Sequence, residues 1–489
     1  MTINKIDLSD LVRTLPITIK DILKAININC LGTLFLVDNL GRLSGVITDG
    51  DIRRALIEGA LLDDQITLNS RIFNHSPHYL DCNEQIYKFW ELFNKGFQCI
   101  PILDGSKKIV DYATPRKIRN FPIMTPLIGE QEKNNVIDCI SSGWISSQGK
   151  YIRDFEIKFE EYLGGGYAIA VSNGTVALQL ALSVLGVKNG DEVILPNYTF
   201  GACINAIINI GATPVLIDVS RENWTIDINL IEKKITSKTK AIMPVHLFGQ
   251  PANMAEINKI ALKNNLFVIE DCAEALGSKV NAKNVGLWGD CSCFSFFANK
   301  NITTGEGGMV VFRNYDLAEK AKILRDHGMS KSKRYWHDEV GFNYRMTNIQ
   351  AGIGVAQLAR IESLLSMKKT VFETYDNFFI KEERLTLLPK NDWSQNSFWL
   401  YALLLKDCGY LFRDNLIKNL NAKGIDARPG FYPLNEMPPF KKYSLDSFPH
   451  TKYLSENTIC LPSSFDLSFE EISYIAKTFI NEYLSLLND

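Results

Sequence analysis

Short apolar segments alternate with helical segments from about residue 125 onward, and this alternation constrains the fold more than any other feature. The apolar segments include YAIAVS, EVILPNY, TPVLIDV, AIMPVHL and LFVIEDC. Because they are apolar nearly throughout, rather than at every second position, they predict strands that are buried on both faces. Strands of this kind joined by helices form a parallel sheet with helices on either side. The sequence therefore predicts an α/β fold for this region.

The predicted pattern of strands and helices changes twice along the chain. Residues 1–120 contain two similar passages, GTLFLVDNLGRLSGVITDGDIRRALIEG and QCIPILDGSKKIVDYATPRKIRNF, each typical of strand, turn, strand and helix. The proline-bearing segment RNFPIMTP follows, and we place a domain boundary there. Beyond about residue 365, helices surround a few strands such as FWLYALLL. We therefore expect three domains, over 1–120, 125–365 and 366–489, the last a smaller α+β domain.

Composition excludes several classes of function. The formal net charge of the 489 residues is −2, so we expect no bulk attraction to nucleic acid or to an anionic membrane. No apolar stretch is long enough to span a membrane, and the charged N-terminal segment is not typical of a signal peptide. Ten cysteines are scattered without disulfide or zinc spacing. We therefore expect reduced thiols in a cytoplasmic protein.

Three segments place polar residues at the ends of predicted strands. In SNGTVALQL, Gly174 and Thr175 open a helix whose N-terminus suits a phosphate, although many strand-to-helix turns look alike. In LFVIEDCAEALGS, Asp271 ends a strand where open α/β sheets bind ligands, but aspartate is also a common helix N-cap. In CFSFFANKNITTGEGG, Ser295 and Lys300 bracket the end of a strand before a glycine-rich turn.

Together these segments supply what pyridoxal phosphate needs. The cofactor requires an amine for a Schiff base, a carboxylate beside its protonated pyridine nitrogen, and a phosphate cradle. Phe200, in LPNYTFGA, offers an aromatic plate for the ring, although an aromatic residue at a strand end also serves as core. The alternative for Lys300 is a surface lysine at a loop edge. The agreement among its neighbours favours chemistry instead.

Residues 125–489 resemble the DegT/DnrJ/EryC1/StrS family of sugar-nucleotide aminotransferases. The stretches that carry the resemblance are SGWISSQGKYIRDFE, AVSNGTVALQLAL, GDEVILPNYTF, MPVHLFGQPANM, VIEDCAEALGS, FSFFANKNITTGEGGMV, LRDHGMS, GFNYRMTNIQAGIG and DARPGFYPL. The resemblance implies the type I pyridoxal-phosphate-dependent fold, similar to aspartate aminotransferase, with a mainly parallel sheet and a smaller α+β C-terminal domain. One branch of the family carries histidine instead of the lysine and dehydrates its substrate, so Lys300 implies transamination.

The resemblance also implies roles for individual residues. Lys300 would form the Schiff base and move the proton, and Asp271 would pair with the pyridinium nitrogen. The phosphate would be held by Gly174, Thr175 and Ser295, and Phe200 would stack on the ring. Glu274 would lie beside the 3-hydroxyl group, and Asn343 would reach the cofactor phosphate of a neighbouring subunit. The last role implies a homodimer or a higher homo-oligomer. His246 and Arg428 are expected to face substrate, with a structural role as the alternative for His246.

The run from RDHGMS through KRYWHDEVGFNYRMTNIQ resembles the branch that contains the GDP-perosamine synthases. This implies transfer of an amino group from L-glutamate to C4 of a nucleotide-linked 4-keto-6-deoxyhexose, in surface-polysaccharide or glycoconjugate biosynthesis. Two alternatives stay open. One is amination at C3, or of a UDP- or dTDP-linked keto-sugar, and the other is a catalytically silent regulatory protein that senses nucleotides. The basic RDHGMSKSKR is either a solvated loop or a loop that closes over the sugar or pyrophosphate.

Residues 1–120 resemble a pair of CBS modules, an α+β domain that commonly binds adenine nucleotides. The stretch GVITDGDIRRAL matches the ribose-binding signature, so Thr48 and Asp51 would offer a hydroxyl and a carboxylate to the ribose hydroxyls. The second module keeps Thr114 but has Lys117 instead of the acid, which argues against a second nucleotide site. A structural or dimerising role is the alternative for the pair.

Overall fold

The computed structural model describes residues 7–82, 84, 88–89, 92–93, 95–114, 120–444 and 446–488. The chain divides into two compact units, each described here by itself. The first is Met1–Phe121 together with Ala422–Gly424, and the second is Pro122–Asn421 together with Ile425–Asp489. Among the described residues, no helix is both long and apolar enough to cross a membrane.

The first unit contains two small sheets with the same arrangement of strands. In each, a parallel pair is followed by an antiparallel pair, in the orders β1-β3-β4 and β6-β7-β8. This repeat agrees with the two similar passages in the sequence. The elements are η1 (Leu8–Asp10), β1 (Val12–Thr14), β2 (Ile17–Thr18), α1 (Ile19–Asn29), β3 (Thr33–Val37), β4 (Leu43–Thr48), α2 (Asp49–Ile57), β5 (Gln65–Ile66), β6 (Leu80–Asp81), β7 (Ile100–Leu103) and β8 (Ile109–Ala113).

The second unit is built on a seven-stranded sheet in the order β11-β10-β12-β13-β16-β17-β9. All neighbours are parallel except β17, which runs antiparallel to both β16 and β9. The mainly parallel sheet predicted from the sequence is therefore confirmed. The strands are β9 (Tyr167–Val171), β10 (Glu192–Pro196), β11 (Thr213–Ile217), β12 (Thr239–Ile242), β13 (Phe267–Asp271), β16 (Cys291–Ser295) and β17 (Gly308–Phe312).

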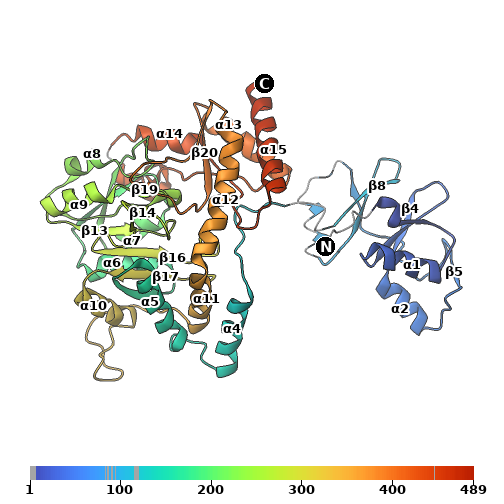
Figure 1. The fold of residues 1–489 in the computed structure, drawn as a ribbon, viewed down its shortest axis with the longest axis horizontal. Helices are drawn as coiled ribbons and strands as arrows, with labels where there is room; N and C mark the ends of the chain where they lie inside the picture. Colours follow the sequence, from blue (N-terminus) through green and yellow to red (C-terminus); the bar gives the residue numbers. More distant parts are fainter. Residues whose placement is uncertain are drawn as a thin grey trace. The chain divides into compact units, whose positions relative to one another are not determined.

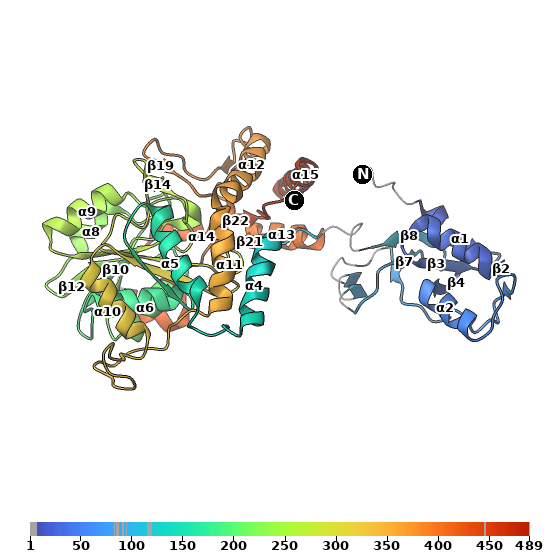
Figure 2. The same ribbon diagram turned by 60° about the horizontal axis from the view of Figure 1, so that its bottom comes forward.

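Helices pack against this sheet, as Figures 1 and 2 show. Helix α6 contacts β13, β16 and β17, and α5 contacts β9. The helices and short helical turns up to the end of the sheet region are α4 (Glu130–Ser142), α5 (Lys150–Leu163), α6 (Gly174–Val184), α7 (Ala202–Asn209), α8 (Ile228–Ile231), η2 (Glu232–Lys234), η3 (Leu247–Gly249), α9 (Met254–Lys263), α10 (Tyr315–Arg325) and α11 (Asn348–Ala359).

The C-terminal part contains an antiparallel sheet in the order β18-β20-β22-β21. A small sheet, β15-β14-β19, joins residues from both parts of the unit. The boundary expected between residues 365 and 366 lies inside helix α12, which runs through it. The elements are α12 (Ile361–Phe379), β14 (Lys279–Val280), β15 (Lys283–Asn284), β18 (Leu385–Thr386), β19 (Ser394–Gln395), β20 (Tyr401–Leu405), α13 (Gly409–Ala422), β21 (Arg428–Pro429), η4 (Leu434–Glu436), η5 (Pro438–Tyr443), α14 (Pro449–Asn457), β22 (Thr458–Leu461) and α15 (Phe469–Asn488).

The direction of the strands brings distant residues together at one edge of the large sheet. Strands β9, β10, β13 and β16 all run the same way, so their carboxyl ends lie at this edge. Open α/β sheets bind ligands at the carboxyl ends of their strands. The sequence predicted a site in four of these places: the segments that follow β9 and β10, and the last residues of β13 and β16.

Candidate active site

A cavity of about 680 Å³ lies at the carboxyl ends of these strands. Eight of the residues predicted from the sequence line it: Gly174, Thr175, Phe200, Asp271, Glu274, Ser295, Lys300 and Arg428. They come from five separate segments of the chain. Parallel strand direction accounts for the meeting of four of them, and Arg428 comes from β21 of the C-terminal sheet. A cavity of this volume is in the usual range for sites that bind small molecules.

Lys300 lies in the turn after β16, and its amine is held inside the cavity. The side chain is 13% exposed, and its Nζ lies 3.9 Å from Oε1 of Glu274. The same nitrogen lies 3.8 Å from the centre of the Trp399 ring. Burial lowers the pKa of the Lys300 amine, while the nearby carboxylates of Glu274 and Asp271 oppose that shift. A lowered pKa increases the share of neutral amine, which is the nucleophilic form.

Glu274 supplies a buried carboxyl group whose pKa is raised. Its Oε2 accepts a hydrogen bond of 2.8 Å from the backbone N–H of Phe248. Burial raises the pKa of Glu274 to about 7, against the opposing charge of Lys300. Glu274 and Lys300 therefore form a buried pair in which the charge of each group opposes the pKa shift that burial causes in the other.

Asp271 is the last residue of β13, and its carboxylate lines the cavity. Oδ1 accepts the N–H of Ala273 at 3.0 Å, and Oδ2 accepts the thiol of Cys203 at 2.9 Å. Turns, rather than a helix, follow β13. The alternative of a helix N-cap therefore does not apply to Asp271, and its carboxylate is available to a ligand.

The segment after β9 forms a cradle of backbone N–H groups. Asn173 caps helix α6 by accepting the N–H of Val176 at 3.0 Å. The N–H groups of Gly174 and Thr175, in the first turn, have no partner within the helix. A Cβ added at Gly174 would lie 2.9 Å from the Cβ of Ser295. Glycine thus permits the close approach of α6 to the end of β16, and an anion there meets a helix N-terminus.

Phe200 is not part of the core. Its side chain is 63% exposed and borders the cavity. Its ring centre lies 6.3 Å from that of Phe431, which also lines the cavity. An exposed aromatic ring beside a cavity is suited to stacking on a flat ligand.

His246 is buried away from the cavity. Its Nδ1 accepts the N–H of Ala252 at 3.0 Å, and its Nε2 lies 3.2 Å from Oε2 of Glu270. Glu270 also accepts three backbone N–H groups, those of Gly286, Trp288 and Gly289. The placement matches the structural alternative for His246, because both ring nitrogens are engaged within the protein.

Arg428 borders the cavity but is paired with a neighbour. Its Nη2 lies 2.8 Å from Oδ2 of Asp426 and its Nε lies 3.1 Å from Oδ1. The side chain remains 55% exposed. A contact between Arg428 and substrate stays a prediction.

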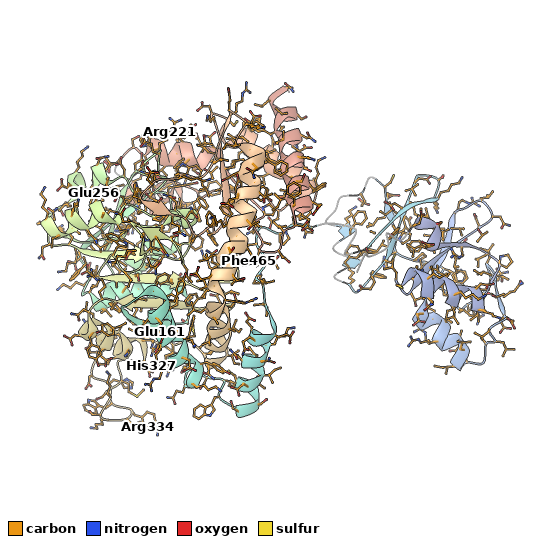
Figure 3. All side chains as sticks on the ribbon, in the orientation of Figure 1. Glu161, Arg221, Glu256, His327, Arg334 and Phe465 are labelled. Atoms are coloured by element: carbon orange, nitrogen blue, oxygen red, sulfur yellow. The ribbon has the colours of Figure 1, made fainter. Side chains whose placement is uncertain are left out.

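Asn343 does not line the cavity of its own chain. It is exposed, and its Oδ1 accepts from the guanidinium of Arg345 at 3.3 Å. The basic loop predicted from RDHGMSKSKR precedes it. Figure 3 shows Arg334 at the far end of this loop and His327 nearer the body of the unit. Lys333 lies 3.9 Å from the ring centre of Trp336 within the loop.

The residues predicted for a nucleotide in the first unit form a capping box on α2. The hydroxyl of Thr48 donates to Asp51 at 2.7 Å, and Asp51 accepts the N–H of Thr48 at 2.8 Å. Asp51 also pairs with Arg54. In the second module Thr114 is buried, and Lys117 lies outside the described residues.

Several residues that line the cavity were not predicted, among them Asn299, Trp399 and Phe431. The indole N–H of Trp399 donates to the carbonyl of Asn299 at 2.7 Å. The position of Asn299 directly before Lys300 was an available signal. Trp399 lies in FWLYALLL, which indicated only a strand, since an apolar run does not show which side chain faces a site.

Comparison with known proteins agrees with this geometry. The DegT/DnrJ/EryC1/StrS aminotransferase family matches residues 126–480, and the CBS domain matches residues 14–58. GDP-perosamine synthase of Escherichia coli O157:H7 is 44% identical over 372 residues, which are 75% of this chain and 100% of that protein. GDP-perosamine synthase of Vibrio cholerae is 40% identical over 369 residues, which are 74% and 99% of the two chains.

Solved structures show the same likeness. The PLP form of the putative sugar aminotransferase Spr1654 from Streptococcus pneumoniae has a TM-score of 0.72 at 31% identity, covering 75% of this chain and 100% of its own. Helicobacter pylori PseC, an aminotransferase of pseudoaminic acid biosynthesis, has a TM-score of 0.72 at 28% identity, with the same coverage.

Fold and site together define a pyridoxal-phosphate-dependent aminotransferase with the type I fold. The chain belongs to the DegT/DnrJ/EryC1/StrS aminotransferase family, and it carries a CBS domain at its N-terminus. The predicted fold class, the enzyme class and the cofactor are thereby confirmed.

The residues present fit this cofactor. The cavity presents a buried amine, a buried carboxylate and a glycine-dependent backbone cradle, in Lys300, Asp271 and Gly174. When bound, pyridoxal phosphate supplies an aldehyde that combines with amines and a ring that accepts electrons. Lys300 would bind the aldehyde carbon, Asp271 would hold the ring nitrogen protonated, and the α6 cradle with Ser295 would hold the phosphate.

Gly174→Ala tests the cradle. The added methyl group would meet the Cβ of Ser295 at 2.9 Å and push α6 away from it. Overpacking of this kind costs about 1–3 kcal/mol, so cofactor affinity should fall by about 5- to 150-fold in a titration of the cofactor-free protein. Gly201→Ala is the matched control. Gly201 also precedes a helix at this edge, has φ −61°, and an added Cβ there comes no closer than 3.9 Å to any atom. Equal affinities for wild type and Gly174→Ala would contradict the assignment.

Proposed function

We propose that this protein moves an amino group from L-glutamate to C4 of a GDP-linked 4-keto-6-deoxyhexose, for surface-polysaccharide or glycoconjugate biosynthesis. The observation that carries the proposal is the meeting of Lys300, Asp271 and the α6 cradle in one cavity. The choice of sugar is supported by the 40–44% identity to proteins named GDP-perosamine synthase. The relatives are covered almost completely by this chain.

Lys300 carries the proton in both halves of the proposed reaction. Its lowered pKa allows the amine to take a proton from the carbon that bears the donor amino group. The resulting ammonium group lies beside Glu274 and over the face of Trp399, both of which stabilise a cation. Lys300 would give this proton to the bound cofactor to complete the first half. In the second half its amine would take a proton back from the cofactor and deliver it to C4 of the sugar, because a reversible path uses the same group as acid and base.

The limited exposure of the site supports this role. Asp271 and Glu274 are both buried, and Trp399 is buried over the amine. Charges in such surroundings act on each other more strongly than they would in water. The chain thus keeps solvent away from the atom that exchanges protons, while the cavity remains open to a small substrate.

A substrate screen tests the proposed reaction. Purified protein is supplied with glutamate and with GDP-, UDP- and dTDP-linked 4-keto and 3-keto sugars, and aminated sugars are measured by mass spectrometry and NMR. We expect amination at C4 of the GDP-linked 4-keto-6-deoxyhexose, with each amino sugar matched by one 2-oxoglutarate.

The other outcomes separate the alternatives. Amination at C3, or a clear preference for a UDP- or dTDP-linked sugar, would replace the proposed substrate while keeping the enzyme class. Turnover of no sugar by cofactor-loaded protein would favour the silent regulatory alternative. Lys300→Ala is the control for product formed without the proposed lysine.

We further propose that the active form is at least a homodimer whose subunits share sites. Two observations support this. Asn343 is exposed and does not line the cavity of its own chain. Exposed apolar side chains also occur on and directly after α4, in Ile137, Ile140 and Trp144. Exposed apolar groups of this kind suit a contact with a second copy.

Mixed dimers test the sharing. Asn343→Ala and Lys300→Ala should each be nearly inactive alone, yet a hybrid dimer retains one site with both residues intact. Random mixing makes half of the dimers hybrid, so activity should recover to about a quarter of wild type. If Asn343 serves its own chain, every site in every dimer lacks one residue, and mixing restores nothing.

We propose an adenine nucleotide as the ligand of the first CBS module, and the cytoplasm as the compartment. The family match over residues 14–58 supports the nucleotide. Asp51 is 21% exposed, so its carboxylate is open to a ribose even while it caps α2. The compartment is supported by the ten cysteines, all of them free thiols, which is usual in a reducing environment.

A further inference from the structure

Cys203 contacts the carboxylate of Asp271. It is the second residue of α7, fully buried, and its Sγ is 2.9 Å from Oδ2 of Asp271. Cys203 does not line the cavity, whereas Asp271 does. A group at this position acts on a ligand through the carboxylate, because it cannot touch the ligand itself.

The direction of this hydrogen bond follows from the chemistry of its two groups. An ionised carboxylate only accepts, so the thiol donates. Burial, together with the charge of Asp271, raises the pKa of the Cys203 thiol, which keeps its proton on sulfur. Thr199 lies 3.5 Å from the same sulfur through its Oγ1 and can donate to it in turn. A short chain of donors thus runs from Thr199 through Cys203 to Asp271.

The two oxygens of Asp271 have different partners on the protein. Oδ1 is held by the backbone N–H of Ala273, and Oδ2 is held by the thiol. Because the two donors hold different oxygens, together they fix the plane of the carboxylate. No charged donor reaches Asp271 among the contacts of the described residues. The thiol is therefore one of two groups that hold this buried anion.

We propose that Cys203 is a positioning residue, which holds the Asp271 carboxylate in the orientation that suits the ring nitrogen of the cofactor. The inference rests on the role proposed above for Asp271. It also links two parts of the site, since Phe200 and Cys203 belong to the same turn into α7, where the N–H of Cys203 lies 3.4 Å from the carbonyl of Phe200. The thiol thereby ties the turn that carries the exposed ring to the strand that carries the carboxylate.

Three single variants test the donor role. Cys203→Ala removes the donor, and the affinity of the cofactor-free protein for pyridoxal phosphate should fall by about 3- to 10-fold, the size of one net hydrogen bond. Cys203→Ser keeps a donor and should stay within about twofold of wild type. Cys291→Ala is the matched control. Cys291 is an equally buried cysteine in neighbouring β16, paired with Ile269 rather than with Asp271, and its loss should leave the affinity unchanged.

A double-mutant cycle separates positioning from general loss of structure. In the background of Asp271→Asn, Cys203→Ala should cause no further loss of cofactor affinity, because the charged carboxylate that the thiol orients is already gone. Cys291→Ala in the same background serves as the additive reference. Melting temperatures of the cofactor-free variants report any loss of folding.

Each outcome decides the question. Weaker binding by Cys203→Ala, rescue by Cys203→Ser and loss of the effect in Asp271→Asn support the inference. If Asp271→Asn weakens binding while Cys203→Ala does not, or if Cys291→Ala weakens it equally, the inference is overturned and the role of Asp271 stands. If Asp271→Asn leaves the affinity unchanged, the proposed role of Asp271 fails, and the role of Cys203 fails with it.

Discussion

The burial of one amine beside two carboxylates is the constraint on which the rest of the site depends. Lys300 loses the water that would keep it charged, which lowers its pKa, and Glu274 and Asp271 limit the fall. Burial also acts on Glu274, and it raises the pKa of that carboxyl group to about 7. Three ionisable groups buried side by side are costly unless each has a partner. The fold meets that requirement with fixed donors, an N–H from Phe248 for Glu274 and a thiol from Cys203 for Asp271.

The sheet delivers these groups because its strands run in one direction. Apolar runs along the chain indicated buried parallel strands, and their order in the sequence indicated which segments would follow a carboxyl end. These patterns indicated six residues of the cavity: Gly174, Thr175, Phe200, Asp271, Ser295 and Lys300. Glu274 and Arg428 were predicted from the family resemblance alone. The antiparallel β17 was not predicted, since an apolar run such as GMVVF carries no sign of its direction.

The remaining features depend on three-dimensional contacts that no local pattern encodes. His246 follows an apolar strand in a family motif, yet its two nitrogens serve Ala252 and Glu270 inside the protein. Cys203 looks like any small apolar residue of a helix until the neighbouring strand places Asp271 against its sulfur. Thr48 and Asp51 show the same ambiguity in the first unit, because the spacing that suits a ribose also makes a helix capping box. A sequence motif thus gives the type of each residue, whereas its role depends on the groups that it contacts in the folded chain.

The central claim is that the amine of Lys300 is the one that bonds to pyridoxal phosphate. The direct measurement is to load the purified protein with the cofactor, reduce the bond between them with borohydride, digest the protein and locate the modified lysine by mass spectrometry. The account predicts one phosphopyridoxyl group, on the peptide that contains Lys300, at close to one per chain. A modified lysine elsewhere, or unmodified Lys300 in protein that has retained the cofactor, would contradict it.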